Sequence, residues 1–227
     1  MIKTQTYLDH CGFIGEYLYS GGNMAREKAF LDTKIIIDKA ICLIENEGFE
    51  HFTTRKLSVA LGTSVMTLYN YFENRKAILR EAILAAFELL WEGLPERLEP
   101  YFEGKNGSPL RAFLAIGDHL RDFAKKRPRL YVFLFRANIV PFQREERIVE
   151  RYSYTFRRVL PFLTDSAKAN ELHRRVFLFE ILANNLVLNA LQGRGNLNEK
   201  IITELIAEAY DGLLSPYEAI VPPPREP

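Results

Sequence analysis

The sequence has few of the features that mark membrane, secreted or metal-binding proteins. It has 2 cysteines in 227 residues, and neither stands in a CxxC or cysteine/histidine spacing typical of a metal site. No apolar run approaches the roughly 20 residues that span a bilayer, and the N-terminus lacks an apolar core followed by a small-residue cleavage site. We therefore expect a cytoplasmic protein with no metal, no cofactor and no membrane partner.

The sequence also lacks the short motifs of common enzymes and a strong charge of either sign. It contains no GxSxG elbow, HExxH or Gly-rich phosphate loop, and no carboxylate pair stands out. The formal net charge is +1, although residues 24–80 contain 9 basic and 7 acidic side chains. We predict no enzymatic activity, and for residues 24–80 only a modest non-specific attraction to nucleic acid.

The most informative stretch is residues 53–76, which predicts two short helices joined by a tight turn. Leu57, Ala60 and Leu61 recur at the spacing of one helical face, and Gly62 follows where a left-handed residue would end a helix. Thr63 and Ser64 then supply the cap of a second helix. Such a pair of helices is typical of a helix-turn-helix.

The second helix of this pair has an outward surface that a hydrophobic core does not require. Its inward positions are Val65, Leu68 and Phe72, whose spacing predicts packing against the first helix. Its outward positions carry Met66, Thr67, Asn70 and Tyr71. A helix-turn-helix places such a face in the DNA major groove, with flanking hydroxyls and cations on phosphates. The alternative is an ordinary helical hairpin with a polar surface.

A family resemblance favours the DNA-binding interpretation. The run LSVALGTSVMTLYNYFENRKAIL, preceded by a helix containing Ala40, Ile44 and Gly48 and then by Thr53, resembles the DNA-binding domain of TetR-family transcriptional regulators. The resemblance implies an all-α fold of about nine helices. A three-helix DNA-binding head would be joined by a long helix to a C-terminal bundle that binds a ligand and dimerises.

The resemblance also implies roles for individual residues. Thr53 and Thr54 would cap the first motif helix and hold phosphate. Met66 departs from the small residue usual at its position, which leaves the operator sequence unreadable. The full set expected to bind DNA is Thr53, Thr54, Arg55, Ser64, Val65, Met66, Thr67, Tyr69, Asn70, Tyr71, Arg75 and Lys76. Within it, Met66, Thr67 and Asn70 would face bases.

The rest of the chain predicts a helical domain with two irregular ends. We expect an extension over residues 1–23, a DNA-binding domain over 24–80, a ligand-binding and dimerisation domain over 81–215 and a disordered Pro-rich tail over 216–227. Translation starting at Met24 is one explanation of the extension, and an arm that reaches the DNA minor groove is another. Prolines and glycines from Pro95 to Pro109 predict a break between helices.

Aromatic residues are frequent in the C-terminal part, which suits a cavity for an apolar or aromatic organic effector. The family binds a small effector in this domain, although aromatics at helical spacing also build ordinary cores. The residues expected to line the cavity are Phe113, His119, Phe123, Tyr131, Phe135, Tyr152, Phe156, Phe177 and Asn184.

The last two predicted helices, residues 166–191 and 198–214, are apolar over wide faces. By resemblance they would form a four-helix bundle with a second copy, while the alternative is that they are the core of a monomer. The residues expected at the dimer interface are Phe179, Leu182, Leu186, Ile201, Leu205, Ile206, Ala209 and Leu213.

Together these expectations describe a regulator of transcription. It would bind a palindromic operator in double-stranded DNA as a homodimer, act as a repressor and be released by the effector. The alternatives are an activator, or a helix-turn-helix fold that serves protein contacts without an effector.

Overall fold

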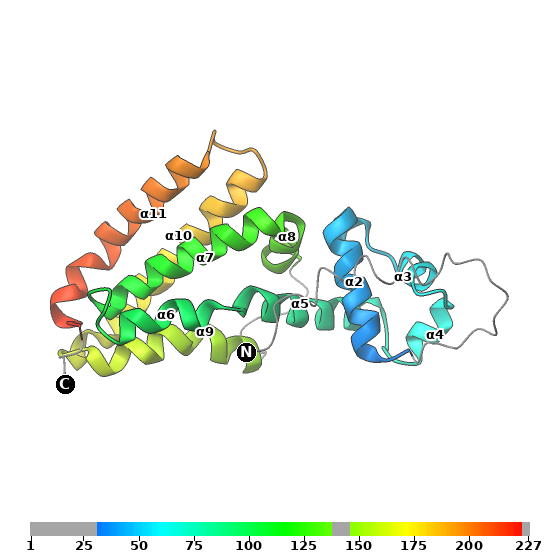
Figure 1. Ribbon diagram of the computed structural model, residues 1–227, viewed down its shortest axis with the longest axis horizontal. Helices are drawn as coiled ribbons and strands as arrows, with labels where there is room; N and C mark the ends of the chain where they lie inside the picture. Colours follow the sequence, from blue (N-terminus) through cyan, green and yellow to red (C-terminus); the bar gives the residue numbers. More distant parts are fainter. Residues whose placement is uncertain (1–30, 138–145, 224–227) are drawn as a thin grey trace. The chain divides into compact units, whose positions relative to one another are not determined.

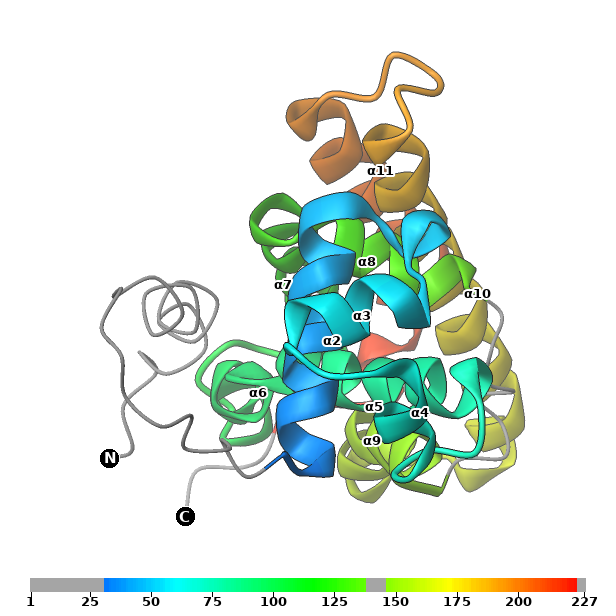
Figure 2. The same cartoon turned by 90° about the vertical axis from the view of Figure 1, so that its right-hand side faces the viewer.

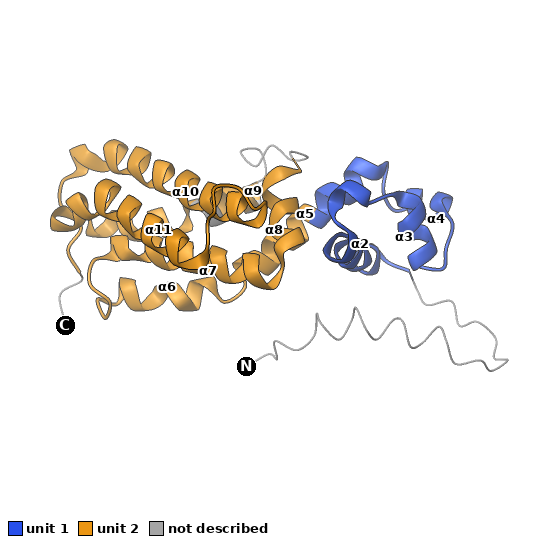
Figure 3. Ribbon diagram, turned by 90° about the horizontal axis from the view of Figure 1, so that it is seen from above, with its two compact units in different colours: residues 1–82 blue, residues 83–227 orange. Residues whose placement is uncertain are grey.

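The computed structural model describes residues 31–137 and 146–223, apart from the side chains at positions 147, 151 and 152. These residues are helical, with no strand among them, and they divide between Ala82 and Ile83 into two compact units (Figures 1 and 3). No helix in the described ranges is long and apolar enough to cross a membrane. The all-α prediction is thus confirmed, whereas the extension expected over 1–23 lies outside the described residues.

Unit 1 begins with α2 (Thr33–Glu47), whose start and end are set by single residues. The carboxylate of Asp32 caps the helix by accepting a hydrogen bond from the Ile35 amide at 2.7 Å. Gly48, at φ 90°, ends it in a conformation that other residues rarely adopt. One face of α2 is the centre of the unit's core, formed by Ile36, Ile37, Ala40, Ile41 and Ile44.

The short helices α3 (Thr54–Ala60) and α4 (Val65–Tyr69) pack next to each other, and α3 also packs against α2 (Figure 2). Gly62 joins them at φ 61°, the left-handed conformation expected from the sequence. Leu57 from α3 and Leu68 from α4 are completely buried. The helix α4 ends at Tyr69, so the expectation that it continues to Phe72 was wrong, although Phe72 is still buried in the turn that follows.

The helix α5 (Arg75–Trp91) crosses the division between the units, and α6 (Leu94–Phe102) follows it. The predicted break from Pro95 is therefore wrong in its first part. Pro95 lies in the first turn of α6, where backbone amides have no intrahelical acceptor, so a residue without an N–H is tolerated. Pro100 is accommodated inside the helix. The described residues contain ten α-helices, α2 to α11, in agreement with the expected number of about nine.

Unit 2 is a bundle that contains five further α-helices. Their bounds are α7 (Ala112–Lys126), α8 (Pro128–Arg136), α9 (Glu146–Val159), α10 (Ala169–Leu191) and α11 (Glu199–Leu213). Packed against α10 are α7, α8 and α11 (Figure 1). A Cβ added at Gly117 of α7 would meet Ile206 of α11 at 3.2 Å, so glycine allows these two helices to approach closely.

Short 3-10 turns complete unit 2: η2 (Pro109–Arg111), η4 (Leu160–Phe162), η5 (Ser166–Lys168) and η6 (Ser215–Ile220). The tail was expected to be disordered from residue 216, which is wrong as far as residue 223. Tyr217 and Val221 are buried, and the Val221 carbonyl accepts a hydrogen bond from the Ser108 hydroxyl at 2.7 Å. The backbone amide of Thr164 also donates to the Ile220 carbonyl at 2.8 Å. Partners from two distant loops, which proline content does not reveal, thus hold the segment in place.

Leu68 and Met66 offer a matched test of the packing in α4. Leu68→Ala removes a completely buried side chain and should lower the free energy of unfolding of unit 1 by about 2–4 kcal/mol. Met66 has 74% of its surface exposed, so Met66→Ala should lower the free energy of unfolding by no more than about 0.5 kcal/mol. Denaturant titration monitored by amide exchange in α3 and α4 measures both. Equal losses would contradict the inward orientation of Leu68.

Candidate DNA-binding surface and ligand cavity

Two hydroxyls fix the start of the helices in the helix-turn-helix. The Thr53 hydroxyl accepts a hydrogen bond from the Lys56 amide at 3.1 Å and caps α3. The Ser64 hydroxyl accepts one from the Thr67 amide at 3.0 Å and caps α4. These caps satisfy amides that would otherwise lack partners, and they place both hydroxyls at helix N-termini, where backbone amides favour phosphate.

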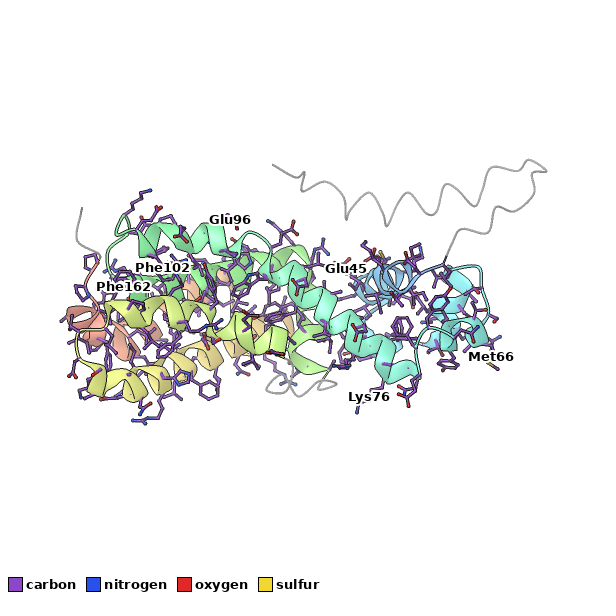
Figure 4. All side chains as sticks on the ribbon, turned by 90° about the horizontal axis from the view of Figure 1, so that it is seen from below. Glu45, Met66, Lys76, Glu96, Phe102 and Phe162 are labelled. Carbon is purple, nitrogen blue, oxygen red and sulfur yellow. The ribbon has the colours of Figure 1, made fainter. Side chains whose placement is uncertain are left out.

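The outward face of the motif carries large side chains that no core requires. Met66 is 74% exposed at the outside of α4 (Figure 4), and Tyr69 and Tyr71 are each about 40% exposed. Asn70 is also exposed, as the residue that ends the helix. The sequence interpretation missed Val59 of α3, which is 73% exposed. An apolar residue that breaks the polar side of an amphipathic helix is the signal that could have found it.

Several residues expected to bind DNA are also bonded within unit 1. The Tyr71 hydroxyl donates to the Leu31 carbonyl at 2.7 Å, and the Tyr69 hydroxyl lies 3.5 Å from that of Thr54. Arg75 donates to the Phe52 carbonyl at 3.0 Å. These bonds hold the side chains in place at the surface rather than leaving them free.

The remaining members of the set differ in exposure. Arg55 and Lys76 are exposed, whereas Thr54, Val65 and Thr67 are half-buried. The hydroxyls of Thr67 and Ser64 form a hydrogen bond, with 2.9 Å between their oxygens. Thr67 therefore supports the cap of α4 as well as its outer face. The twelve residues thus lie within one short region of unit 1, from the start of α3 to the start of α5.

Unit 2 contains a cavity of about 520 Å³ lined by residues of α5, α6, α7, α8, α9 and α10. Its volume is within the range of sites for small organic molecules. Most of its wall is apolar. The lining residues are Phe87, Leu90, Trp91, Leu94, Ile116, His119, Leu120, Phe135, Val149, Ser153, Thr155, Phe156, His173, Val176, Phe177, Glu180, Ile181 and Asn184.

The structure brings together five of the nine residues expected at the cavity. These are His119, Phe135, Phe156, Phe177 and Asn184. Phe113, Phe123 and Tyr131 are instead buried in the core, outside the lining, because their faces of α7 and α8 meet other helices. The side chain of Tyr152 lies outside the described residues.

Two polar groups of the wall have defined hydrogen-bonding roles. Nε2 of His119 lies 2.6 Å from the Leu90 carbonyl, so this nitrogen donates. Burial lowers the pKa of His119, which favours the neutral imidazole with Nδ1 as an acceptor. The Tyr131 hydroxyl donates to Oδ1 of Asn184 at 2.7 Å. This bond orients the amide of Asn184 at the wall.

Glu180 is the acidic residue among the lining residues that sequence reasoning missed. Among the described residues, its carboxyl has no hydrogen-bond or ion-pair partner. Removal from water raises the pKa of this carboxyl from the ordinary 4.5 to about 7. The available signal was one acidic residue inside the apolar run VFLFEILA, where a solvated face is not expected.

The helix α10 also has an apolar face that is partly exposed at the surface of unit 2. Phe177, Leu178, Ile181 and Leu182 are between 42% and 59% exposed. Of the residues expected at a dimer interface, Leu182 belongs to this face. Leu186, Ile201, Leu205, Ala209 and Leu213 are half-buried. Phe179 and Ile206 are buried inside the unit, which removes them from any interface between copies.

Comparison with known proteins gives a family match for the N-terminal part of the chain. The family model for bacterial regulatory proteins of the tetR family matches residues 36–82, the part that holds α3 and α4. A search of curated proteins gave no match. In the described residues, no group of three histidine, cysteine or acidic side chains could hold a metal.

Solved structures extend the likeness in fold to more than four fifths of the chain. TetR from Acinetobacter baumannii AYE is 17% identical with a TM-score of 0.57, over 84% of this chain and 98% of that one. A variant of TetR from the same strain, solved in complex with minocycline, is 20% identical with a TM-score of 0.54, over 83% and 97%. A transcriptional regulator from Rhodococcus sp. RHA1 is 16% identical with a TM-score of 0.56, over 83% and 98%.

At these identities the solved structures show the fold, while the matched domain carries the family assignment. That family consists of non-enzymatic DNA-binding regulators of transcription. Residues 36–82 thus match the DNA-binding domain model of the tetR family of bacterial regulatory proteins, and the chain shares its fold with solved regulators of that family.

Proposed function

We propose that the protein is a ligand-responsive repressor that acts in the cytoplasm, binds a palindromic operator as a homodimer and is released by a small organic effector. The observation that carries this proposal is the double use of α10, which both forms a wall of the cavity and presents an exposed apolar face. A ligand in the cavity would contact the helix through which two copies associate.

Binding as a dimer follows from the size of the DNA-reading surface. The helix α4 has five residues and can reach only a few base pairs. Residues 24–80 also carry little excess positive charge, so phosphate attraction adds modestly to affinity. Two copies on one palindrome would double the contacts, and the symmetric pairing would set the spacing of the half-sites.

The proposed interface is the outer face of α10 together with the half-buried side of α11. Four exposed apolar residues in two helical turns are unusual for a surface in contact with water. Leu178 and Leu182 do not line the cavity, so their exposure is explained by association rather than by ligand binding.

Footprinting of the purified protein across genomic DNA tests the function as a whole. We expect protection of palindromic sites whose half-sites lie about one or more helical turns apart. Affinity should fall as salt concentration rises, since phosphate contacts release counterions. Absence of any salt-dependent DNA affinity would instead favour a fold used for protein contacts.

Substitutions at Tyr69 and Asn70 should separate affinity from specificity. Tyr69→Ala removes an exposed hydroxyl and ring expected on the phosphate backbone, so it should weaken binding to operator and random DNA alike. Asn70→Ala removes an amide expected at a base edge, and should cost about 1–3 kcal/mol on the operator only. Parallel titrations with both DNAs measure the two effects. Equal losses on both DNAs for both variants would refute this division.

Leu182→Asp should separate the two copies. A carboxylate placed in an apolar interface loses water without gaining a partner, so sedimentation should show a monomer and operator affinity should fall. Leu160→Asp is the control, because Leu160 is similarly exposed, at 37% against 44%, but lies on η4. If both variants dissociate, unfolding is the explanation. If neither variant dissociates, the two copies associate through a different interface.

A further inference from the structure

Glu180 lies where an acidic side chain is costly unless a ligand compensates it. The residues of α10 that line the cavity recur at i, i+3, i+4, i+7, i+8 and i+11, so they form one face of the helix: His173, Val176, Phe177, Glu180, Ile181 and Asn184. Glu180 is central in this face. Glu180 is half-buried in this wall, and among the described residues its carboxyl is neither paired nor hydrogen-bonded.

Within the described ranges, the rest of the wall contains no permanently charged cation to neutralise this carboxyl. Among the described residues, no lysine or arginine lines the cavity. The other titratable side chains among the described lining residues are His119 of α7 and His173 of α10, while those from α5, α6, α8 and α9 do not titrate. His119 already donates its Nε2 proton to the Leu90 carbonyl. His173 stacks on Phe156, with ring centroids 4.7 Å apart.

The aromatic part of the wall suits a positive charge as well as an apolar body. Phe135, Phe156 and Phe177 line the cavity together with Trp91. The faces of aromatic rings attract cations, and more strongly where water is absent. A carboxylate and several rings around one space therefore favour the same kind of ligand.

We propose that the effector is an organic cation, with an amine or quaternary ammonium group that pairs with Glu180 and an apolar body that fills the cavity. The regulatory role of this ligand rests on the proposed function, whereas binding of the cation at Glu180 does not. A buried carboxylate without a partner gains far more from a cation than an exposed one, because little water screens the pair.

The ionisation of Glu180 provides a second readout of the same contact. With a pKa of about 7, the folded protein retains this proton between about pH 4.5 and 7, whereas the unfolded chain releases it. The free energy of unfolding should therefore decrease as pH rises through that range. Glu180→Gln should remove the part of this decrease that comes from Glu180. Cation binding at pH 7 should release a fraction of one proton.

The test uses two ligands of equal shape that differ only in charge. One is 4-(2-naphthyl)butyl-trimethylammonium, and the other has a carbon in place of the ammonium nitrogen. Calorimetric titration of the full chain at pH 8 should give a dissociation constant about tenfold or more lower for the cation. In Glu180→Gln this preference should fall to about one, with no proton release at pH 7 in buffers of different ionisation enthalpy.

Glu208→Gln is the matched control, because Glu208 is an exposed carboxylate on α11 that does not line the cavity. It should leave the preference for the cation unchanged. Equal binding of both ligands by the wild-type chain, or a cation preference that survives Glu180→Gln, would overturn the proposal. The pH dependence of unfolding of Glu180→Gln verifies that this variant is folded.

Operator titration in the presence of the cation separates this proposal from the proposed function. Charge-selective binding that changes operator affinity supports both. Charge-selective binding without any change in operator affinity supports the cation site and contradicts its role as the effector site. No charge selectivity, together with operator binding as a dimer, contradicts the cation site alone.

Discussion

Unit 2 depends on the orientation of α10, whose sides face three environments: the core, the cavity and the surface. Successive residues of an α-helix point about 100° apart, so neighbours in the sequence meet different environments. Phe179 is buried in the core, Glu180 lines the cavity, and Leu178 faces outward. A shift of one residue in register would bury the carboxyl among core side chains and expose the phenyl ring. The cavity therefore depends on the packing of α10 against α7, α8 and α11.

In unit 1, the candidate DNA-binding surface is formed by very short helices. Helices of five to seven residues are not stable by themselves. The caps at Thr53 and Ser64, and the buried pair Leu57 and Leu68, supply the stability that length does not. The bond from Arg75 to the Phe52 carbonyl further joins the start of α5 to the chain before α3. The outer face is thus fixed by contacts beneath it.

Features set by local chemistry could be predicted from the sequence. The cap at Ser64 and the left-handed Gly62 follow from what single residue types can do, and both were predicted. The expectation failed where tertiary contacts decide. Pro100 is held inside α6, and Val221 is held by a hydrogen bond to Ser108, more than one hundred positions away in the chain.

The cavity was only partly predictable for the same reason. Composition shows that aromatics are abundant but not which of them face a space, and this depends on the rotation of each helix. Phe156 and Phe113 have the same chemistry, yet one lines the cavity and the other is in the core. Glu180 was overlooked because a charge on a helix is usually solvated, and only the apolar residues on both sides of it indicate otherwise.

Two side chains of α10, Phe177 and Ile181, belong both to the cavity wall and to the exposed apolar face. On the proposed interface, a substitution at either position would change ligand fit and subunit association together. Adaptation to a new effector is then less constrained at the wall residues of α7 and α9, such as Ile116 and Phe156. Related regulators with different effectors should accordingly vary more at those positions than at Phe177 and Ile181.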